Sequence, residues 1–336
     1  MNATDNLTQD CNPLHLYAAG EPRVSQALLW GSLVHCYCVM VLGTLGNALA
    51  LWCVGTCAKT RGTVKALLVS VFLPALLVCL ATRPIIVETR YALLTCDSHR
   101  VSVMALRINM TLYNILAQTE LASIAVVAVI RVVSVWAPQT QTLGLRWTVG
   151  LVTAIWMYSI LTGLGMMGLV MTGEVDRSWS IITALYFLNT TLPALITAAA
   201  YIVIIVIMRR NKRRLADSQQ QRRPRGTTMD QQVTLAMQAV FLSNMVFGLP
   251  HSVYHLMGKQ PYYLYIIFHI LFSTHFVMDP LAFVWFNRCY RRRVLSRMKN
   301  MNRSMTSRTA SSVPLGSSAS QSVIHHHHPE LSKETL

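Results

Sequence analysis

Five ionisable side chains lie inside long apolar stretches of this sequence, where charged residues are otherwise rare. They are Arg83, Arg107, Glu120, Arg131 and Asp279. An ionisable group at the depth of a membrane is costly enough to be a functional candidate, because it needs a partner, water or a ligand beside it. The arginines could instead extend along their aliphatic stems to the membrane surface. The arginines could bind an anion, and the two acids could bind a proton or a cation.

The apolar stretches that carry these residues are long enough to cross a membrane. Of the 336 residues, 53% are hydrophobic and 12% are charged, and a soluble domain of this composition would expose much apolar surface. A helix needs about 20 apolar residues to span the hydrocarbon core. Seven such spans are predicted, at residues 28–54, 64–87, 103–135, 147–171, 180–208, 231–257 and 262–286. None shows the alternation of a barrel strand, so the predicted fold is an all-α membrane protein, a seven-transmembrane helix bundle.

Positive charge is concentrated on one side of the predicted bundle. Lys and Arg cluster in the connections that include residues 59–65, 146, 208–225 and 287–303, whereas the opposite connections mix basic with acidic residues. By the positive-inside rule, the N-terminus lies outside and the C-terminal tail is cytoplasmic. The net charge of +16 is therefore attributed to topology and to attraction for anionic lipid, and no nucleic-acid partner is expected.

Four regions follow from this topology. They are an extracellular tail (1–25), the bundle (26–288), a short amphipathic helix on the inner membrane surface (289–300) and a disordered cytoplasmic tail (301–336). Asn2 and Asn6 begin glycosylation sequons in the outer tail. Cys11 and Cys96 are the two cysteines on the outer side, and they form a candidate disulfide or remain free. The run His325–His328 in the tail is interpreted as a compositional accident, and no metal site is predicted.

Motifs at fixed places within the spans are similar to those of one family. Span one contains Gly46-Asn47, span three ends near Arg131, and span four carries Trp156. The later spans contain Pro193 with Tyr201 eight residues on, Pro250, and the run Asp-Pro-Leu-Ala-Phe at 279–283. In order and spacing, the chain resembles a rhodopsin-like (class A) G-protein-coupled receptor over residues 25–300. The resemblance implies a plasma-membrane receptor that is not an enzyme and that binds a heterotrimeric G protein, with arrestin recruited by the Ser-rich tail.

Several positions depart from the pattern of that family. Ala75 replaces the span-two aspartate, Ile130 and Val132 replace the acid and the aromatic residue beside Arg131, and Gly248 stands where a span-six tryptophan is usual. Phe283 replaces the span-seven tyrosine. A seven-helix receptor that binds without signalling is therefore the alternative interpretation. A transporter or channel is a further alternative, although no internal repeat or matching pair of broken spans is present.

The resemblance also places a set of candidate ligand-binding residues in the outer half of the bundle. They are Arg83, Arg107, Tyr113, Asn114, Gln118, His251, Tyr254, His255, Tyr265 and His269. Tyr113 occupies the position of the carboxylate that binds an amine, so a biogenic amine is disfavoured. Arginines with histidines and tyrosines favour an anionic or polar ligand, such as a carboxylate, a lipid acid or a peptide. The alternative role of these side chains is interhelical hydrogen bonding.

Two further pairs of residues are expected to act deeper in the bundle. The resemblance places Glu120 at a position that lines the family's sodium site and Asp279 in the span-seven motif. The two acids are therefore predicted to lie close together and form a site sensitive to protons or sodium, the only ion expected. Two separately hydrogen-bonded acids are the alternative. Arg131 is predicted to contact Asp230 at the cytoplasmic face, which would leave the resting state weakly restrained because the adjacent acid is missing. The resemblance assigns switch and coupling roles to Tyr201, Pro250 and Pro280 as well.

Overall fold

The computed structural model describes residues 24–58, 60–97, 99–136, 144–172, 179–218, 229–257 and 261–311. Every regular element in these segments is helical. Residues 1–293 form one compact unit, and residues 294–336 form a second. The elements in chain order are α1 (Gln26–Cys38), η2 (Val39–Gly43), α2 (Thr44–Thr56), α3 (Gly62–Leu77), η3 (Val78–Thr82), α4 (Arg83–Thr95), α5 (Val103–Trp136), α6 (Leu145–Met171), α7 (Trp179–Tyr186), η4 (Phe187–Thr191), α8 (Leu192–Ser218), α9 (Met229–Leu256), α10 (Tyr262–Ser273), α11 (His275–Phe286) and α12 (Arg288–Ser311).

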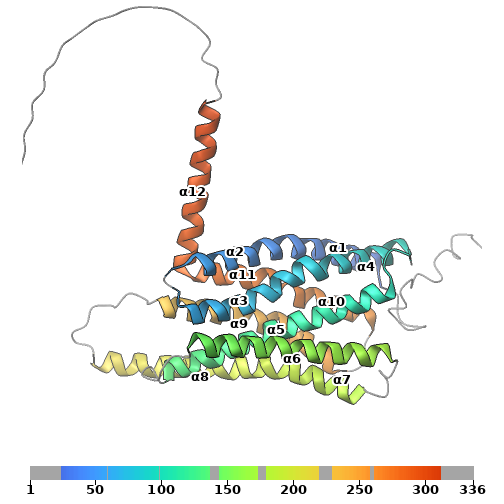
Figure 1. Cartoon of the computed structure of the whole chain (residues 1–336), viewed down its shortest axis with the longest axis horizontal. Coiled ribbons are helices and arrows are strands. Elements are labelled where there is room, and N and C mark those ends of the chain that lie inside the picture. The colour runs from blue at the N-terminus through green and yellow to red at the C-terminus, as the bar shows by residue number, and fades with distance from the viewer. Residues whose placement is uncertain are drawn as a thin grey trace, which may run out of the picture. The chain divides into compact units, whose positions relative to one another are not determined.

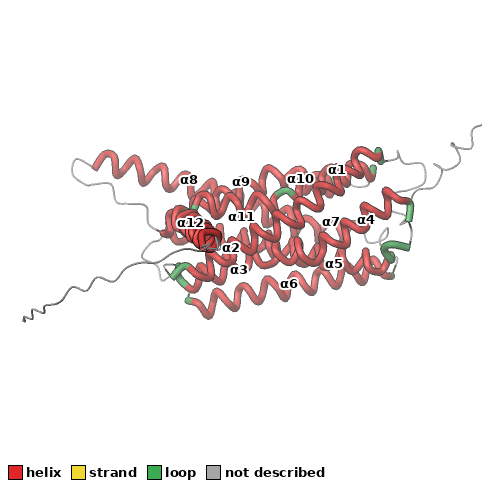
Figure 2. Tube along the Cα trace, turned by 90° about the horizontal axis from the view of Figure 1, so that it is seen from above, coloured by secondary structure: helices red, strands yellow, loops and turns green. Residues whose placement is uncertain are grey.

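Several consecutive elements form continuous long helices. The wider π-helical turns η2, η3 and η4 each join an α-helix before them to one after them without a break. Figures 1 and 2 show these long helices lying side by side, with α3, α5 and α6 as neighbours in both views. Helix α5 also packs against α8, and α11 packs against α9 and α2. The long first unit is therefore a helical bundle.

The bundle is that of a multi-pass membrane protein. Six helical segments in the described part of the chain are long and apolar enough to cross a membrane. They are Gln26–Thr56, Gly62–Thr95, Val103–Trp136, Leu145–Met171, Ser180–Arg210 and Tyr262–Phe286. These segments correspond to six of the seven predicted spans. Helix α9 covers the remaining predicted span, but it is not among the six.

The two ends of the bundle differ in their charged side chains. The Gln26 end is where α1 begins, α4 ends, α9 ends and α10 begins. The Thr56 end is where α2 ends and α3 begins, and where α9 starts. The Thr56 end carries the exposed basic side chains Arg61, Arg146 and Arg210. The Gln26 end has both acidic and basic groups, including the ion pair between Arg100 and Glu88 at 2.7 Å.

Close packing in the middle of the bundle depends on small residues. A Cβ atom on Gly43 would lie 2.6 Å from Sγ of Cys79, so η2 and η3 can approach this closely only because Gly43 lacks a side chain. A Cβ atom on Gly46 would lie 3.0 Å from Cγ of Pro280. Asn47 donates from Nδ2 to the carbonyl oxygens of Gly43 and Phe276, at 2.8 Å and 3.0 Å. The Gly46-Asn47 motif thus joins the first long helix to α11.

Several predicted boundaries differ from the structure. The second long helix continues past residue 87 to Thr95, because Glu88 and Arg90 are good helix formers. Helix α12 continues past residue 300 to Ser311. The structure thus has a helix over residues 301–311, within the region 301–336 that the sequence predicts to be disordered. This stretch contains no Gly or Pro, and residues 312–336 lie outside the described residues.

Candidate functional site

A cavity of about 320 Å³ lies near the Gln26 end of the bundle. Side chains from α1, α4, α5, α9 and α10 line it. The polar and aromatic members of the lining are Ser32, His35, Arg83, Thr89, Arg90, Tyr113, Tyr254, Tyr262, Tyr265, His269 and Ser273. Leucine, isoleucine, methionine and cysteine supply the rest. A concave, mostly apolar pocket with a few convergent polar groups is the usual form of a small-molecule site.

Two arginines of α4 dominate the electrostatics of this cavity. Arg83 and Arg90 are seven residues apart, which places them on one face of the helix two turns apart, and their exposed fractions are 3% and 5%. Arg90 donates from Nη1 to the hydroxyl of Tyr262 at 2.8 Å. Cζ of Arg83 lies 5.6 Å from the ring centroid of Tyr113 and 5.3 Å from that of Phe276. The lining contains neither aspartate nor glutamate, so no acid in it pairs with these charges.

Part of each guanidinium group is left without a hydrogen-bond acceptor. Nε and Nη2 of Arg83 and Nε of Arg90 are buried and form no hydrogen bond. Buried polar groups are normally satisfied, and an unsatisfied buried donor costs about 1–3 kcal/mol. Aromatic faces compensate a cation only partly. The arrangement is therefore suited to receive an anionic group.

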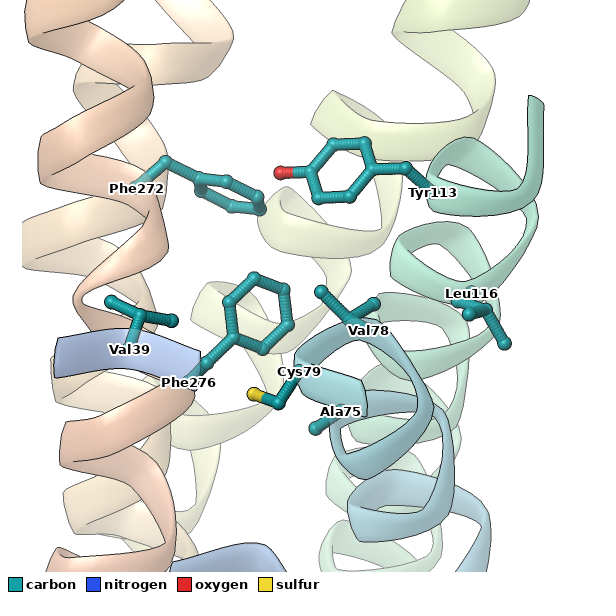
Figure 3. Close-up of a cluster of buried hydrophobic side chains, with 8 residues drawn as sticks. All are labelled: Val39, Ala75, Val78, Cys79, Tyr113, Leu116, Phe272 and Phe276. Carbon is teal, nitrogen blue, oxygen red and sulfur yellow. The ribbon is translucent and has the colours of Figure 1, made fainter. Parts of the chain in front are cut away.

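A layer of apolar side chains lies directly beneath the cavity. Figure 3 shows this layer, to which Tyr113 of α5, Phe272 of α10 and Phe276 of α11 contribute their rings. Cys79 and Val78 of η3 pack against the same cluster. Tyr113 belongs to both the layer and the cavity lining. The layer separates the arginines from the acids deeper in the bundle.

Three histidines form a cluster on one side of the cavity. Nε2 of His251 lies 3.1 Å from Nε2 of His255 and 3.4 Å from Nε2 of His269. His251 and His255 are four residues apart on α9 and therefore share a face, while His269 comes from α10 and lines the cavity. The ring of Tyr265 lies against His269, with centroids 3.7 Å apart.

Five of the ten predicted ligand-binding residues line the cavity. These are Arg83, Tyr113, Tyr254, Tyr265 and His269. His251 and His255 adjoin it through His269. Sequence reasoning did not select Arg90, His35 and Tyr262, which also line the cavity. The spacing of seven between Arg83 and Arg90 could have identified Arg90 if the span had been extended past residue 87.

The other three candidates lie away from the cavity. Arg107 is exposed and its Nη1 lies 3.4 Å from Sδ of Met171 on α6. Oε1 of Gln118 accepts a hydrogen bond of 3.0 Å from Thr162, also on α6, and Asn114 is exposed. Residues 107, 114 and 118 share one face of α5, which is turned toward α6, whereas the cavity face carries Leu106, Met110 and Tyr113. The prediction was one residue out of helical phase.

A second polar cluster lies deeper in the bundle. Glu120 of α5 and His275 and Asp279 of α11 are buried, and their ligand-type atoms lie within 4.8 Å of one another. The prediction that Glu120 and Asp279 lie close together is therefore confirmed. Nε2 of His275 is 3.6 Å from Oε2 of Glu120, and Nδ2 of Asn244 donates to Oδ2 of Asp279 at 2.5 Å.

His275 changes what this second cluster can hold. Sequence reasoning did not select it, although a histidine four residues before Asp279 lies on the same helical face. Nδ1 of His275 donates to the carbonyl oxygen of Phe272, which turns Nε2 toward Glu120. Carboxylate oxygens are suitable ligands for a hard cation such as sodium, whereas imidazole is not a typical ligand for one. A protonated His275 would itself supply a positive charge between the acids, so the set fits a proton as well as a sodium ion.

Two motif residues nearer the Thr56 end, Arg131 and Tyr201, are also buried. Arg131 has an exposed fraction of 9%, and its guanidinium group lies within electrostatic range of Tyr201. Tyr201 stacks on Phe241 of α9, with ring centroids 4.7 Å apart. Pro250 and Pro280 lie inside α9 and α11, respectively. The predicted partner of Arg131, Asp230, lies in the first turn of α9, but its side chain lies outside the described residues.

The remaining candidates lie partly or wholly outside the described residues. Asn2, Asn6 and Cys11 belong to residues 1–23, and His325–His328 belong to residues 312–336. Cys96, at the C-terminal end of α4, is disulfide-bonded, but the structure does not describe its predicted partner Cys11. Its backbone is left-handed, with φ of 55°. Among the described cysteines, Cys36, Cys38, Cys53, Cys57, Cys79 and Cys289 form no disulfide bond, and Sγ of Cys57 lies 3.8 Å from Sγ of Cys289.

Comparison with known proteins adds no assignment to this geometry. No protein-family model matches the chain, and no curated protein matches it. Functional arguments therefore depend on the side chains of the cavity and of the two clusters.

Proposed function

We propose that this protein is a seven-helix receptor of the rhodopsin-like class, which binds an anionic ligand in the cavity and signals to a heterotrimeric G protein. The observation that carries the ligand class is the pair of buried arginines, Arg83 and Arg90, in a lining without acids. A carboxylate or phosphate would supply both the missing charge and the missing acceptors, which arginine binds in a bidentate fashion. The apolar remainder of the lining favours a lipid acid or another carboxylate with a hydrocarbon body.

Helix α9 supplies the seventh crossing in this proposal. It has 28 residues and so a length of about 42 Å at 1.5 Å per residue, more than the roughly 30 Å of a hydrocarbon core. It packs against α8, α10 and α11. Its polar residues Gln238, Asn244 and His251 lower its hydropathy, but Asn244 and His251 are buried against other helices and need not face lipid.

The charge distribution supports one orientation of the bundle. The basic residues at the Thr56 end would face the cytoplasm, with the cavity opening toward the outside and the N-terminus extracellular. We place the receptor in the plasma membrane, since the resemblance to surface receptors and the two outer sequons agree with that location. The cytoplasmic end would then present Arg131 and the start of α9 to the G protein, and a phosphorylated tail to arrestin.

The signalling part of the proposal predicts activity without ligand. Ile130 replaces the acid that would restrain Arg131, so the contact with Asp230 is the main restraint on the resting state. A restraint can shift a two-state equilibrium by no more than its difference in free energy between the states. We therefore expect measurable basal recruitment of one class of G protein. Asp230→Ala should increase it, Ile130→Asp should decrease it, and Arg131→Ala should reduce coupling.

The experiment measures recruitment of a panel of G-protein subunits in cells at matched surface expression. Zero basal recruitment across all classes, unchanged by the three substitutions, would favour the alternative of a receptor that does not signal. Solute uptake or ionic current in cells that express the unsubstituted chain would instead identify a transporter or channel.

The ligand part of the proposal is tested by substituting the two arginines of the cavity, with Arg107 as the matched control. A set of fatty acids, dicarboxylates and their methyl esters is applied to the same cells, and recruitment is measured again. Acids should change recruitment and esters should not, because only the acids carry the charge that Arg83 and Arg90 require. Arg83→Gln and Arg90→Gln should abolish the response, while Arg107→Gln should retain it because Arg107 lies outside the cavity. Equal loss in all three variants would contradict the assignment of the cavity.

A further inference from the structure

The three-histidine cluster has the geometry of a metal site. The Nε2 atoms of His255 and His269 lie 3.1 Å and 3.4 Å from Nε2 of His251, and all three lie within 4.8 Å of one another. Imidazole nitrogens held about 2.0–2.1 Å from a tetrahedral zinc ion are roughly 3.3–3.4 Å apart. The same three nitrogens could therefore bind one ion after small side-chain movements.

The hydrogen bonds around the cluster leave the Nε2 atoms of His251 and His269 available to bind a metal ion. Nδ1 of His269 lies 2.8 Å from the carbonyl oxygen of Tyr265, which can only accept, so Nδ1 carries the proton and Nε2 carries a lone pair. Nδ1 of His251 lies 3.3 Å from the hydroxyl of Tyr186, which can hold the proton of that ring on Nδ1. A hydrogen bond from the second nitrogen to a carbonyl or hydroxyl is the usual support of a metal-bound histidine.

Without an ion, these contacts are poorly satisfied. Nε2 of His251 faces two other imidazole nitrogens, and one proton on it can serve only one of them well. Where two lone pairs face each other, the contact is repulsive. A metal ion turns all three lone pairs into favourable ligands. The aromatic ring of Phe272, stacked on His251 with centroids 4.3 Å apart, restricts the ring to this orientation.

We propose that His251, His255 and His269 bind one divalent transition-metal ion, with Zn²⁺ as the expected species. Three neutral imidazoles suit zinc, copper or nickel and do not suit calcium or magnesium, which take oxygen ligands. The three-ligand set leaves a fourth position for water or an anion. An anion there would also offset the repulsion between the ion and the arginines of the cavity. The site does not depend on the receptor function, since it stands on the geometry of the three histidines alone.

The spacing His251-x3-His255 is a sequence signal for this site. Two histidines four residues apart on one helical face can bind a metal together, as in metalloprotease helices. The prediction of no metal site missed the cluster because its third member comes from another helix, α10. Helix α9 ends at Leu256 and α10 begins at Tyr262.

The test uses the purified full chain in lipid nanodiscs, with His325–His328 replaced by serine. This background removes the tail histidines, which could bind metal by themselves. After incubation with Zn²⁺ and gel filtration, the metal content per chain is measured. We expect one Zn²⁺ per chain, and a higher thermal unfolding temperature with Zn²⁺ than with Mg²⁺.

The cluster and control variants decide the proposal. His255→Ala and His269→Ala should lose the bound ion, whereas His255→Cys should keep it because cysteine is also a zinc ligand. His35→Ala is the matched control, since His35 lines the same cavity outside the cluster, and it should keep the ion. No bound Zn²⁺ in the background chain, or equal Zn²⁺ in His255→Ala and His269→Ala, would overturn the proposal. Unfolding temperatures measured without metal establish that the compared variants are folded.

Discussion

The bundle contains two clusters with buried histidine, and they differ in the charge that surrounds them. His251, His255 and His269 lie beside a cavity that contains two arginines and no acid. His275 lies deeper, between Glu120 and Asp279. The deeper cluster can balance charge within itself, because a proton on His275 compensates one carboxylate. The cavity cannot, because no acid in its lining compensates Arg83 and Arg90.

In our proposal, the deeper cluster stabilises the fold and the cavity binds a ligand. A buried ion pair is costly to break because the remaining charge stays buried without its partner. An uncompensated buried charge is costly while it is present, so removing it relieves the fold. Substitutions in the two regions should consequently change stability in opposite directions. The three predictions below test that contrast, from the largest expected effect to the smallest.

The largest effect is expected at Glu120. Glu120→Ala leaves His275 and Asp279 without their partner, and the free energy of unfolding should fall by about 3 kcal/mol. Thermal or chemical unfolding of the purified full chain measures this change. Ser123→Ala is the matched control on the same helix, because its buried hydroxyl makes no hydrogen bond, and it should cost much less.

The isosteric variant Glu120→Gln separates charge from packing at the same position. It should weaken the dependence of stability on sodium concentration and on pH, because the site loses one carboxylate. The shared site is wrong if Glu120→Gln leaves stability and both of these responses unchanged.

An intermediate effect is expected in the apolar layer that keeps the two regions apart. Gly43→Ala places a methyl group 2.6 Å from Sγ of Cys79, so η2 and η3 must separate. Such overpacking typically costs about 1–3 kcal/mol. The double variant Gly43→Ala, Cys79→Ala removes the clash and should recover part of the loss, which a double-mutant cycle measures.

Gly55→Ala serves as the matched control for this layer. A Cβ atom on Gly55 would meet nothing within 4 Å, and alanine is favoured over glycine in a helix by up to about 1 kcal/mol. The control should therefore be neutral or stabilising. Equal loss in Gly43→Ala and Gly55→Ala would show that the contact with Cys79 is not the cause.

The smallest effect, and the opposite sign, is expected at Arg83. Without an anionic ligand, Arg83→Met should leave stability unchanged or raise it by about 1 kcal/mol, because it removes a buried charge that no acid of the cavity lining compensates. The comparison variant is Arg100→Met. Arg100 is exposed, and its hydrogen bond to Glu88 raises the pKa of its guanidinium group, so it stays charged. Its loss should not measurably change stability, because exposed pairs contribute little.

Loss of stability in Arg83→Met comparable to that in Glu120→Ala would contradict the contrast. It would mean that the aromatic rings of Tyr113 and Phe276 already compensate Arg83, and the argument for an anionic ligand would lose its main support. The same unfolding assay on the same preparation measures both variants.

Periodicity and composition determined much of this protein. The apolar stretches predicted the long helices to within a few residues in most cases, because a helix must cover about 20 apolar residues to cross a membrane. The family resemblance placed Arg83, Tyr113, Tyr254, Tyr265 and His269 where the cavity forms. The pairing of Glu120 with Asp279 followed from the same resemblance together with a physical argument, that buried acids face the interior of a bundle.

The tertiary structure alone decided which helical face meets which neighbour. On α5, the face that lines the cavity and the face with Arg107 and Gln118 are offset by one residue, which is a rotation of about 100° on a helix. The sequence does not reveal which face lines the cavity, because apolar residues occur on all sides of the helix. The second long helix extends past residue 87, and this extension places Arg90 in the lining of the same cavity as Arg83. The packing of α10 against α9 decided that His269 meets His251, and contacts between distant segments of this kind depend on side-chain packing that no local pattern encodes.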